Sequence, residues 1–244
     1  MTKDIIKAYC ASANIPLDDE KAAKFEELTR LLLEYNSHTN LTAIRDEEGV
    51  AVKHHADSLA PLAYGYELIP EGARVADVGC GAGFPGLPLC VMRPDIRMTF
   101  IDSTDKKLRF TRSAVAALGL GEDRIECLTR RAEEIVAADG RREGYDVVVS
   151  RAVAALPVLC ELCLPFVKCG GTFIAYKASG ASDELKAAKK AIPTLGGRVV
   201  EVREVVLPET GGEKLCHSLI IIRKEKPTPA KYPRRYAQIV KSPL

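Results

Sequence analysis

Residues 77–86 read DVGCGAGFPG and follow the short apolar run Arg74-Val75-Ala76. A further apolar segment, residues 87–91, comes directly after them. The apolar approach is typical of a buried strand, and the glycines allow the backbone to turn with positive φ and to come close to a ligand. The stretch therefore predicts a strand, a ligand-binding turn and a helix in succession. The alternative is a tight turn whose glycines serve only the backbone.

Three of these glycines, Gly81, Gly83 and Gly86, match the pattern GxGxxG, which after a strand usually indicates a dinucleotide site with a pyrophosphate at the helix N-terminus. Asp77 changes this interpretation, because a carboxylate two residues before Gly79 repels a pyrophosphate and suits an ammonium group. S-adenosylmethionine carries such an ammonium. We therefore expect Asp77, Gly79, Gly81 and Gly83 to bind S-adenosylmethionine.

The composition sets wider bounds on the chain. It has 244 residues, with 35 Lys and Arg against 33 Asp and Glu, so its formal net charge is +2. This length suffices for one large α/β domain, alone or with an appendage. The overall charge does not indicate nucleic acid, but basic residues gather in residues 223–241, where Glu225 is the single acid.

The cysteine pattern and the hydropathy indicate a cytoplasmic protein. The eight cysteines lie mostly in apolar surroundings, without the density of a small secreted scaffold, which fits a reducing compartment. Cys160 and Cys163 form a CxxC in an apolar, helix-like run with no second Cys/His pair nearby, so we expect no metal. We see no signal-peptide pattern and no run of about 20 apolar residues, so we expect no membrane partner.

The chain divides into three parts. Residues 1–70 are predicted to be a helical extension, with helices over 17–35 and 46–64 separated by the turn formers of residues 36–40. In residues 71–224, strand and helix signals alternate as in parallel βαβ units, and a final pair of strands forms an antiparallel hairpin at the edge of the sheet. Residues 225–244 form a basic segment. The predicted strands are 74–78, 97–102, 124–128, 145–150, 171–176, 199–207 and 217–224. The predicted helices of this second part are 86–92, 105–118, 132–138, 156–166 and 183–195.

Three positions fall at the carboxyl ends of predicted strands, where a ligand of such a sheet binds. Asp102 is placed to accept hydrogen bonds from ribose hydroxyls, or to cap the following helix. Glu133 is placed beside the adenine, or is an ordinary first-turn acid. Arg151 follows a run of valines and contacts a cofactor or anionic substrate, or forms a structural salt bridge. For His38, His54 and His55 we favour capping or packing of helix ends.

Several motifs together resemble a known family. They are YNSHTNLT (residues 35–42), HADSL (55–59), DVGCGAGFPG (77–86), SRA (150–152) and KYPRR (231–235). Over nearly its whole length the chain is similar to the bacterial ribosomal RNA small subunit methyltransferase G family, also called glucose-inhibited division protein B. Departures are Cys80, Cys169 and the tail Tyr236-Ala237-Gln238.

The resemblance implies a class I methyltransferase: an α/β, Rossmann-like fold with a seven-stranded sheet. It implies methyl transfer from S-adenosylmethionine to N7 of one guanine of 16S rRNA in the small ribosomal subunit, position 527 of the 530 loop, which gives 7-methylguanosine. The family's cofactor contacts fall on Gly79, Phe84, Ala132, Glu133 and Arg151. On the substrate side, Asn36, Asn40, His55 and Arg151 are positioning candidates.

RNA is expected to bind to the basic C-terminal segment through Lys231, Tyr232, Arg234 and Arg235, with Tyr232 and Tyr236 available for base stacking. The alternative is a solvated tail. We expect removal of residues after Lys224 to weaken RNA binding and to leave cofactor affinity unchanged. A monomer is expected.

Guanine N7 carries a free lone pair at neutral pH, so its methylation needs no general base, and placement of the reactants can supply roughly 7–11 kcal/mol. The competing interpretations are a methyltransferase of protein or small molecules, an NAD-dependent oxidoreductase and a catalytically silent RNA-binding protein.

Overall fold

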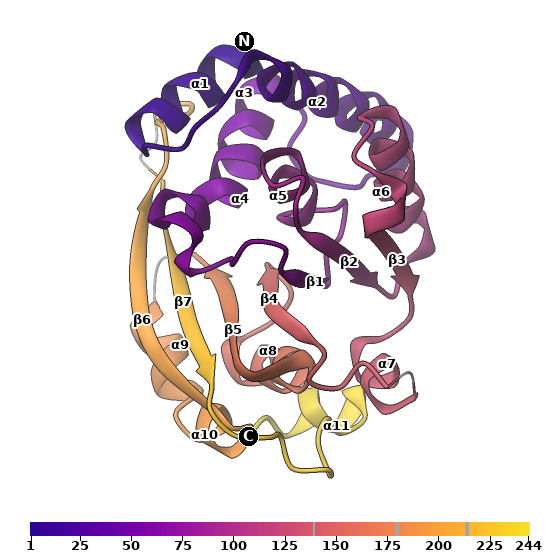
Figure 1. Cartoon of the computed structure of the whole chain (residues 1–244), viewed down its shortest axis with the longest axis vertical. Helices are drawn as coiled ribbons and strands as arrows, with labels where there is room; N and C mark the ends of the chain where they lie inside the picture. Colours follow the sequence, from indigo (N-terminus) through magenta and orange to yellow (C-terminus); the bar gives the residue numbers. More distant parts are fainter. Residues whose placement is uncertain (139, 179–180, 213–214) are drawn as a thin grey trace.

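The computed structural model describes residues 1–138, 140–178, 181–212 and 215–244 (Figure 1). The strands are β1 (Arg74–Val78), β2 (Arg97–Asp102), β3 (Ile125–Thr129), β4 (Tyr145–Arg151), β5 (Val167–Lys177), β6 (Gly197–Val206) and β7 (Cys216–Lys224). The α-helices are α1 (Thr2–Ser12), α2 (Asp19–Thr39), α3 (Glu47–Gly49), α4 (Asp57–Leu59), α5 (Gly86–Met92), α6 (Asp105–Ala117), α7 (Ala132–Ala138), α8 (Leu156–Cys163), α9 (Ala181–Ala187), α10 (Ala191–Thr194) and α11 (Tyr236–Lys241). Other helical segments are the π-helix η1 (Val50–Ala56) and the 3₁₀ turns η2 (Ala60–Glu67), η3 (Glu122–Arg124) and η4 (Leu164–Phe166).

All seven strands belong to one sheet in the order β3-β2-β1-β4-β5-β7-β6. The first five pair in parallel, and β7 pairs antiparallel with both β5 and β6. The predicted terminal hairpin is therefore confirmed, with β6 as the edge strand; residues 213–214 of its loop lie outside the described residues. The chain reverses its direction across the sheet between β1 and β4, which is where open α/β sheets bind ligands.

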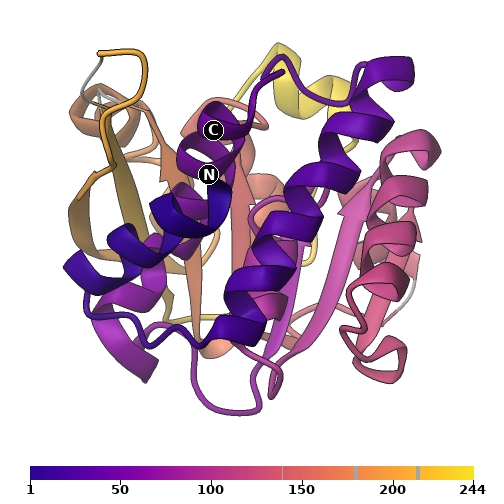
Figure 2. The ribbon, with the colours of Figure 1, turned by 90° about the horizontal axis from the view of Figure 1, so that it is seen from above.

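Neighbouring residues on each strand enter different cores, as the two-residue period of a strand requires. Val75 and Val147 belong to one apolar cluster, whereas Ala76 and Val148 belong to the other. The first cluster packs under α1, α2, α5 and α6, and the second packs under α8 and α11. Figure 1 and Figure 2 show these two helical layers on opposite faces of the sheet.

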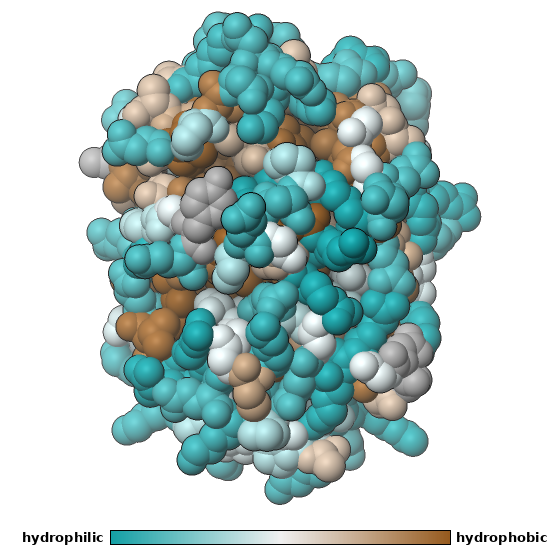
Figure 3. Space-filling model, in the orientation of Figure 1, coloured by the Kyte–Doolittle hydropathy of each residue, from teal (hydrophilic) through white to brown (hydrophobic). Residues whose placement is uncertain are grey.

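The N-terminal helices share the core of the sheet. Ile6 of α1 and Phe25 of α2 lie in the same cluster as Phe100 of β2. The boundary predicted at residue 70 therefore does not separate two cores. Figure 3 shows mostly hydrophilic side chains on this face of the molecule, with apolar ones visible mainly beneath the helices at the top.

The predicted helices of this region need three corrections. Helix α1 was not predicted. Helix α2 continues through the predicted turn to Thr39 and ends at Asn40, whose φ of 52° is the left-handed cap that asparagine tolerates. The predicted helix 46–64 is broken into α3, η1, α4 and η2, because a π-helical segment interrupts it. Downstream, the predicted helix 183–195 is two helices, α9 and α10.

The C-terminal segment is docked on the domain and is not a solvated tail. Lys224 is buried and donates from Nζ to the carbonyl of Leu164 and to Thr228 Oγ1. Arg142 donates to the carbonyls of Thr228, Pro229 and Tyr232. Residues 225–244 therefore share the packing of the sheet domain, and the boundary predicted at residue 224 crosses these contacts.

The described residues lack two features. None of their helices is long and apolar enough to cross a membrane. Among the same residues, no group of three or more His, Cys, Asp or Glu side chains is arranged to hold a metal ion.

Candidate cofactor site and substrate cleft

The glycine turn after β1 needs its glycines for conformation and for space. Gly79, Gly81 and Gly83 have φ values of 71°, 57° and 85°. A Cβ on Gly79 would lie 2.4 Å from Val153 Cγ2, whereas a Cβ on Gly81 would have nothing within 4 Å. The turn is tied to β2, because Gly79 N–H donates to the carbonyl of Ile101 at 2.8 Å and Gly81 N–H donates to Asp102 Oδ2 at 3.0 Å.

Asp77 is bonded to the residue at which the glycine turn ends and α5 begins. Its side chain is completely buried, and Oδ2 accepts the N–H of Gly86 at 2.8 Å at the first residue of α5. Burial raises the pKa of Asp77 to about 7, although the Gly86 hydrogen bond opposes this. Asp77 lines neither of the two cavities described below. Oδ2 of the carboxylate therefore holds the start of α5, whereas Oδ1 has no hydrogen-bond partner among the described residues, and its contact with the ammonium of a cofactor stays a prediction.

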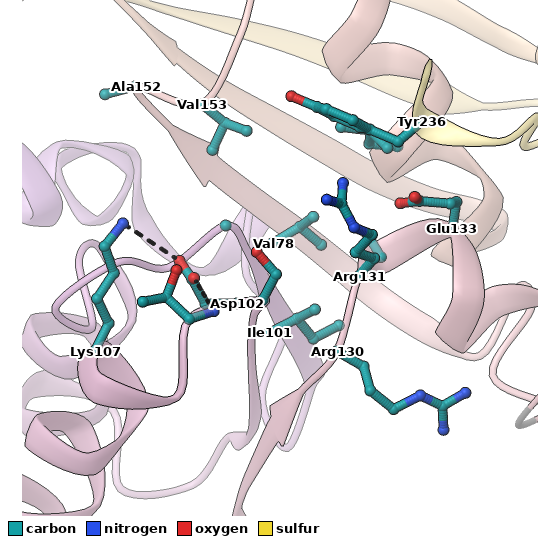
Figure 4. A pocket seen from close by; sticks show the side chains of 15 residues that line it. Val78, Ile101, Asp102, Lys107, Arg130, Arg131, Glu133, Ala152, Val153 and Tyr236 are labelled. Carbon is teal, nitrogen blue, oxygen red and sulfur yellow. Dashed lines mark hydrogen bonds and ion pairs between the residues drawn. The ribbon is translucent and has the colours of Figure 1, made fainter. Parts of the chain in front are cut away.

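A first cavity of about 400 Å³ opens at the carboxyl ends of β1, β2 and β3 (Figure 4). Its lining residues are Val78, Gly79, Ile101, Asp102, Ser103, Thr104, Lys107, Arg130, Arg131, Ala132, Glu133, Ala152, Val153, Leu162 and Tyr236. The predicted residues Gly79, Asp102, Ala132 and Glu133 are thus brought together. Tyr236, which the sequence placed with the RNA, also lies here.

Asp102 bonds the backbone at the start of α6, which bears on its capping alternative, while its ribose contact stays a prediction. Its Oδ1 accepts the N–H of Thr104 at 2.8 Å, although the residue that caps α6 is Thr104 itself. Lys107 Nζ lies 3.9 Å from Oδ2. A carboxylate has about four lone-pair positions, so acceptor capacity remains on the cavity side for hydroxyl donors.

A second cavity of about 540 Å³ adjoins the first, and Gly79, Lys107 and Ala152 line both. Its other lining residues are Leu41, Thr42, Lys53, His54, Asp57, Cys80, Gly81, Ala82, Phe84, Arg151, Tyr176, Lys177, Ala178, Glu184 and His217. The ring of Phe84 stacks on that of His54, with centroids 4.6 Å apart. The glycine turn thus forms the shared wall of one cleft with two compartments.

Arg151 stands at the end of β4 and joins the second cavity to the N-terminal helices. Its Nη1 donates to Asp57 Oδ2 at 2.8 Å and to the carbonyl of Lys53 at 3.1 Å. Lys53 belongs to η1, and a π-helix displaces backbone carbonyls from the regular ladder and is frequent at functional sites. The structural salt bridge is therefore present at a residue that also lines the cleft, and the alternative, contact with a cofactor or an anionic substrate, stays a prediction.

Asp57 is the buried anion of this cluster, and His217 of β7 is its second partner. His217 Nδ1 lies 2.9 Å from Asp57 Oδ1. Burial acts to raise the pKa of Asp57, but the hydrogen bond from His217 and the charge of Arg151 outweigh it and hold the pKa below its usual value. No sequence pattern singled out His217, because its partner lies 160 residues away.

The neighbouring histidines are held neutral. Burial, with the charge of Arg151, lowers the pKa of His54 to about 2 and that of His55 to about 3. His54 Nε2 lies 2.9 Å from Thr42 Oγ1, and His55 Nε2 lies 2.8 Å from Thr29 Oγ1. Both therefore serve packing and hydrogen bonding, as predicted, and neither is a proton donor near neutral pH.

Three positioning candidates do not reach the cleft. Asn36 is buried and bonds the backbone of Thr42 in both directions. Asn40 caps α2 and accepts from Arg45. His55 is fully buried. None of the three lines the second cavity, where the structure places Lys53, His54 and His217, and their role in positioning a guanine stays a prediction.

The RNA-binding candidates of the C-terminal segment divide into two pairs. Tyr232 is only 7 % exposed and belongs to the second apolar cluster, so its ring is not available to stack on a base. Arg234 donates from Nη2 to the fully buried Glu161 at 2.6 Å. Both side chains are thus engaged within the chain, and their contact with RNA stays a prediction. Lys231 and Arg235 are exposed and stay candidates.

The fold resembles solved methyltransferases. A precorrin-6y C5,15-methyltransferase from Geobacter metallireducens matches with a TM-score of 0.53 and 17 % identity, covering 77 % of this chain and 92 % of that one. A SAM-dependent methyltransferase from Methanosarcina mazei matches with a TM-score of 0.50 and 16 % identity, covering 66 % and 96 %. With the sheet order and the cleft at the β1/β4 reversal, these matches define the fold as that of the class I methyltransferases.

Sequence comparison narrows this class to one family. Ribosomal RNA small subunit methyltransferase G of Moorella thermoacetica is 46 % identical over 240 residues, covering 98 % of this chain and 97 % of the relative. The protein of the same name in Geobacillus thermodenitrificans is 44 % identical over 238 residues, with the same two coverages. The profile of the rRNA small subunit methyltransferase G family matches residues 21–211. The chain therefore belongs to the rRNA small subunit methyltransferase G family and is a methyltransferase.

Proposed function

We propose that this enzyme transfers a methyl group from S-adenosylmethionine to N7 of one guanine of 16S rRNA, the 527 position of the 530 loop. The observation that carries the proposal is the two-compartment cleft at the glycine turn, with Asp102 in one compartment and basic side chains in the other, in a chain of this family. We further propose that the enzyme acts as a monomer in the cytoplasm on small-subunit RNA.

The residues present fit the proposed cofactor. In the first cavity, Asp102 can accept hydrogen bonds from the ribose hydroxyls. Ala132 and Glu133, at the start of α7, can lie beside the adenine. Gly81 leaves its backbone uncovered, because no atom lies within 4 Å of where its Cβ would be. Gly79, Phe84 and Arg151 line the adjoining compartment, toward which the amino-acid end extends. When bound, S-adenosylmethionine supplies a methyl group activated by its sulfonium.

The second cavity suits a guanine base together with the neighbouring phosphates of the RNA chain. Arg151 is neutralised by Asp57, and Lys177 lies 3.0 Å from Glu184. Lys53 makes no ion pair among the described residues, so its ammonium is open to a phosphate. A donor on guanine N7 would occupy the attacking lone pair, and the neutral His54 is compatible with leaving N7 free.

The deciding experiment incubates the enzyme with methyl-labelled S-adenosylmethionine and unmethylated small ribosomal subunits, followed by mapping of the labelled nucleotide. We expect 7-methylguanosine at one position of 16S rRNA. Label on another atom, or label only in protein or small molecules, would overturn the proposed substrate and methylation site. A thermal-shift comparison of S-adenosylhomocysteine with NAD and NADP tests the cofactor, since a ligand at 100 times its Kd stabilises by about 2.7 kcal/mol.

A matched pair of variants links the activity to the cleft. Asp102→Asn removes the charge that faces the first cavity, and we expect about tenfold weaker binding of S-adenosylhomocysteine, because hydrogen bonds to charged groups contribute about 1.5–3 kcal/mol. Asp105→Asn is the control, because Asp105 pairs with the exposed Arg109 outside the cavity lining. Equal affinities of the two variants would remove Asp102 from the ribose role.

A further inference from the structure

One side of the first cavity is formed by a residue from the C-terminal segment, Tyr236. Tyr236 is the first residue of α11, lines the cavity and is 38 % exposed. The guanidinium carbon of Arg131 lies 5.0 Å from the centre of the tyrosine ring. Figure 4 shows the ring above Arg131 and across the cavity from Asp102 and Lys107.

Contacts on both sides of Tyr236 hold it in this place. Before it, the N–H of Arg234 donates to Glu161 Oε1 at 2.8 Å, and Glu161 lies on α8 beside Leu162, which lines the cavity. After it, Ile239 of α11 is fully buried in the second apolar cluster. The start of α11 is therefore anchored to the helix that forms part of the cavity wall.

The surroundings of the ring suit a flat heteroaromatic group. Val78, Ile101 and Leu162 are apolar lining residues of the same cavity, and Arg131 lies over the tyrosine ring at cation–π distance. An aromatic ring that adjoins such a cavity can stack on a purine, because every base offers a π-face. The ribose-facing carboxylate of Asp102 opens into the same cavity.

We propose that Tyr236 stacks on the adenine of the cofactor and that Arg131 is a positioning residue, which holds the tyrosine ring in place. Helix α11 is then part of the cofactor site. The C-terminal segment therefore contributes to cofactor binding, in addition to the RNA binding predicted for it. The inference depends on the proposed function, in that the ligand of the first cavity is S-adenosylmethionine. Removal of the segment after Lys224 is accordingly expected to weaken cofactor binding, in contrast to the expectation from the sequence.

Calorimetric titration of the full chain with S-adenosylhomocysteine tests the stacking. We expect Tyr236→Ala to raise the Kd about tenfold, within the range for loss of a base–aromatic stack, and Tyr236→Phe to keep it within about twofold. Val240→Ala is the matched control, since Val240 is exposed on the same helix and outside the cavity lining, and it is expected to leave the Kd unchanged. Free adenosine should lose affinity by the same factor in Tyr236→Ala.

A tryptophan at this position gives a second readout that does not depend on activity. The chain contains no Trp, so Tyr236→Trp introduces a single indole. We expect its emission to change on saturation with S-adenosylhomocysteine and to stay constant with homocysteine, while the indole of Val240→Trp responds to neither.

The outcomes separate this inference from the proposed function. An unchanged Kd in Tyr236→Ala, or an unresponsive indole at position 236 while calorimetry shows binding, would overturn the stacking and leave the cofactor in place. A wild-type chain that does not bind S-adenosylhomocysteine would overturn the proposed function itself.

Discussion

Arg151 Nη1 and Asp57 Oδ2 lie 2.8 Å apart although 94 residues separate them in the chain. The pair connects the carboxyl end of β4 to the short helix α4 after the π-helix, and both residues line the second cavity. Asp57 is 1 % exposed, and His217 of β7 holds its other oxygen. One buried carboxylate thus joins the N-terminal helices, the parallel strands and the terminal hairpin at the cleft.

This relationship makes Asp57 important for stability. Asp57→Asn would leave the guanidinium of Arg151 without its anion in a largely buried site, and we expect the free energy of unfolding to fall by about 3 kcal/mol. Urea denaturation measures the change. Asp19→Asn is the control, because its ion pair with Lys7 is on the surface and is expected to leave the midpoint unchanged. Equal midpoints in both variants would show that the buried pair contributes little.

The raised pKa of Asp77 predicts how the free energy of unfolding changes with pH, with a sign opposite to that of an acid in an ion pair. Its pKa is about 7 in the folded chain, above the usual unfolded value of about 3.9. Between these two values the folded state binds more protons than the unfolded state, so stability is full at low pH and falls as pH rises toward 7. We expect Asp77→Asn to remove up to about 1.4 kcal/mol per pH unit from the slope of unfolding free energy against pH in this window.

Urea denaturation at several pH values between about 4.5 and 7.5 measures this slope. Comparison with Asp183→Asn, a strongly exposed acid on α9, removes the contribution of unrelated groups. The assignment is contradicted if Asp77→Asn and Asp183→Asn show the same slope.

Much of the fold followed from local pattern. Strands β1 and β2 and helices α5 and α7 have the predicted bounds. Their apolar runs end at residues that stop an element, such as Gly79 after β1, Asp102 at the end of β2 and Pro94 after α5. The order of elements also predicted the terminal hairpin, since a polar Gly-Gly loop separates its strands. Asp102, Ala132 and Glu133 come at or after the carboxyl ends of predicted strands, which meet at one edge of a parallel sheet. They were therefore expected to lie near one ligand, and they line the same cavity.

The remaining features depend on long-range contacts. The π-helix η1 changes backbone hydrogen bonding without changing the hydrophobic pattern, so residues 46–64 were interpreted as one helix. The inward direction of Asp77 was not evident, because a strand-end acid can face the helix start as readily as the ligand. For Glu161 a signal existed: an acid inside the apolar run of α8 requires a cationic partner when buried, and that partner is Arg234.

Gly79 lines both compartments and tests the glycine turn directly. In Gly79→Ala the new Cβ would lie 2.4 Å from Val153 Cγ2 at a φ of 71°, so we expect a stability loss of about 2 kcal/mol and at least about tenfold weaker binding of S-adenosylhomocysteine. Gly119→Ala has a similar φ of 58° but open space, and is expected to lose about 1 kcal/mol with unchanged affinity. Denaturation and calorimetry on both variants decide the matter, and equal effects would assign the loss to backbone conformation alone.

Arg234 and Arg235 are adjacent in sequence and are expected to have different roles. Arg234 neutralises the fully buried Glu161 through Nε and Nη2, so Arg234→Ala would leave a buried carboxylate unpaired and lower the unfolding free energy by about 3 kcal/mol. Arg235 is exposed, and Arg235→Ala is expected to leave stability unchanged.

The RNA measurement completes this comparison. If Arg235 contacts a phosphate, Arg235→Ala lowers the slope of log K against log salt by about 0.7–0.9, the value for one released counterion. Filter binding of a 16S rRNA fragment over a salt series measures the slope, with Arg198→Ala as the control, because Arg198 is exposed at the edge strand β6 and pairs with Glu225. An unchanged slope in Arg235→Ala would exclude Arg235 from the RNA contact and leave Lys231 as the exposed candidate of this segment.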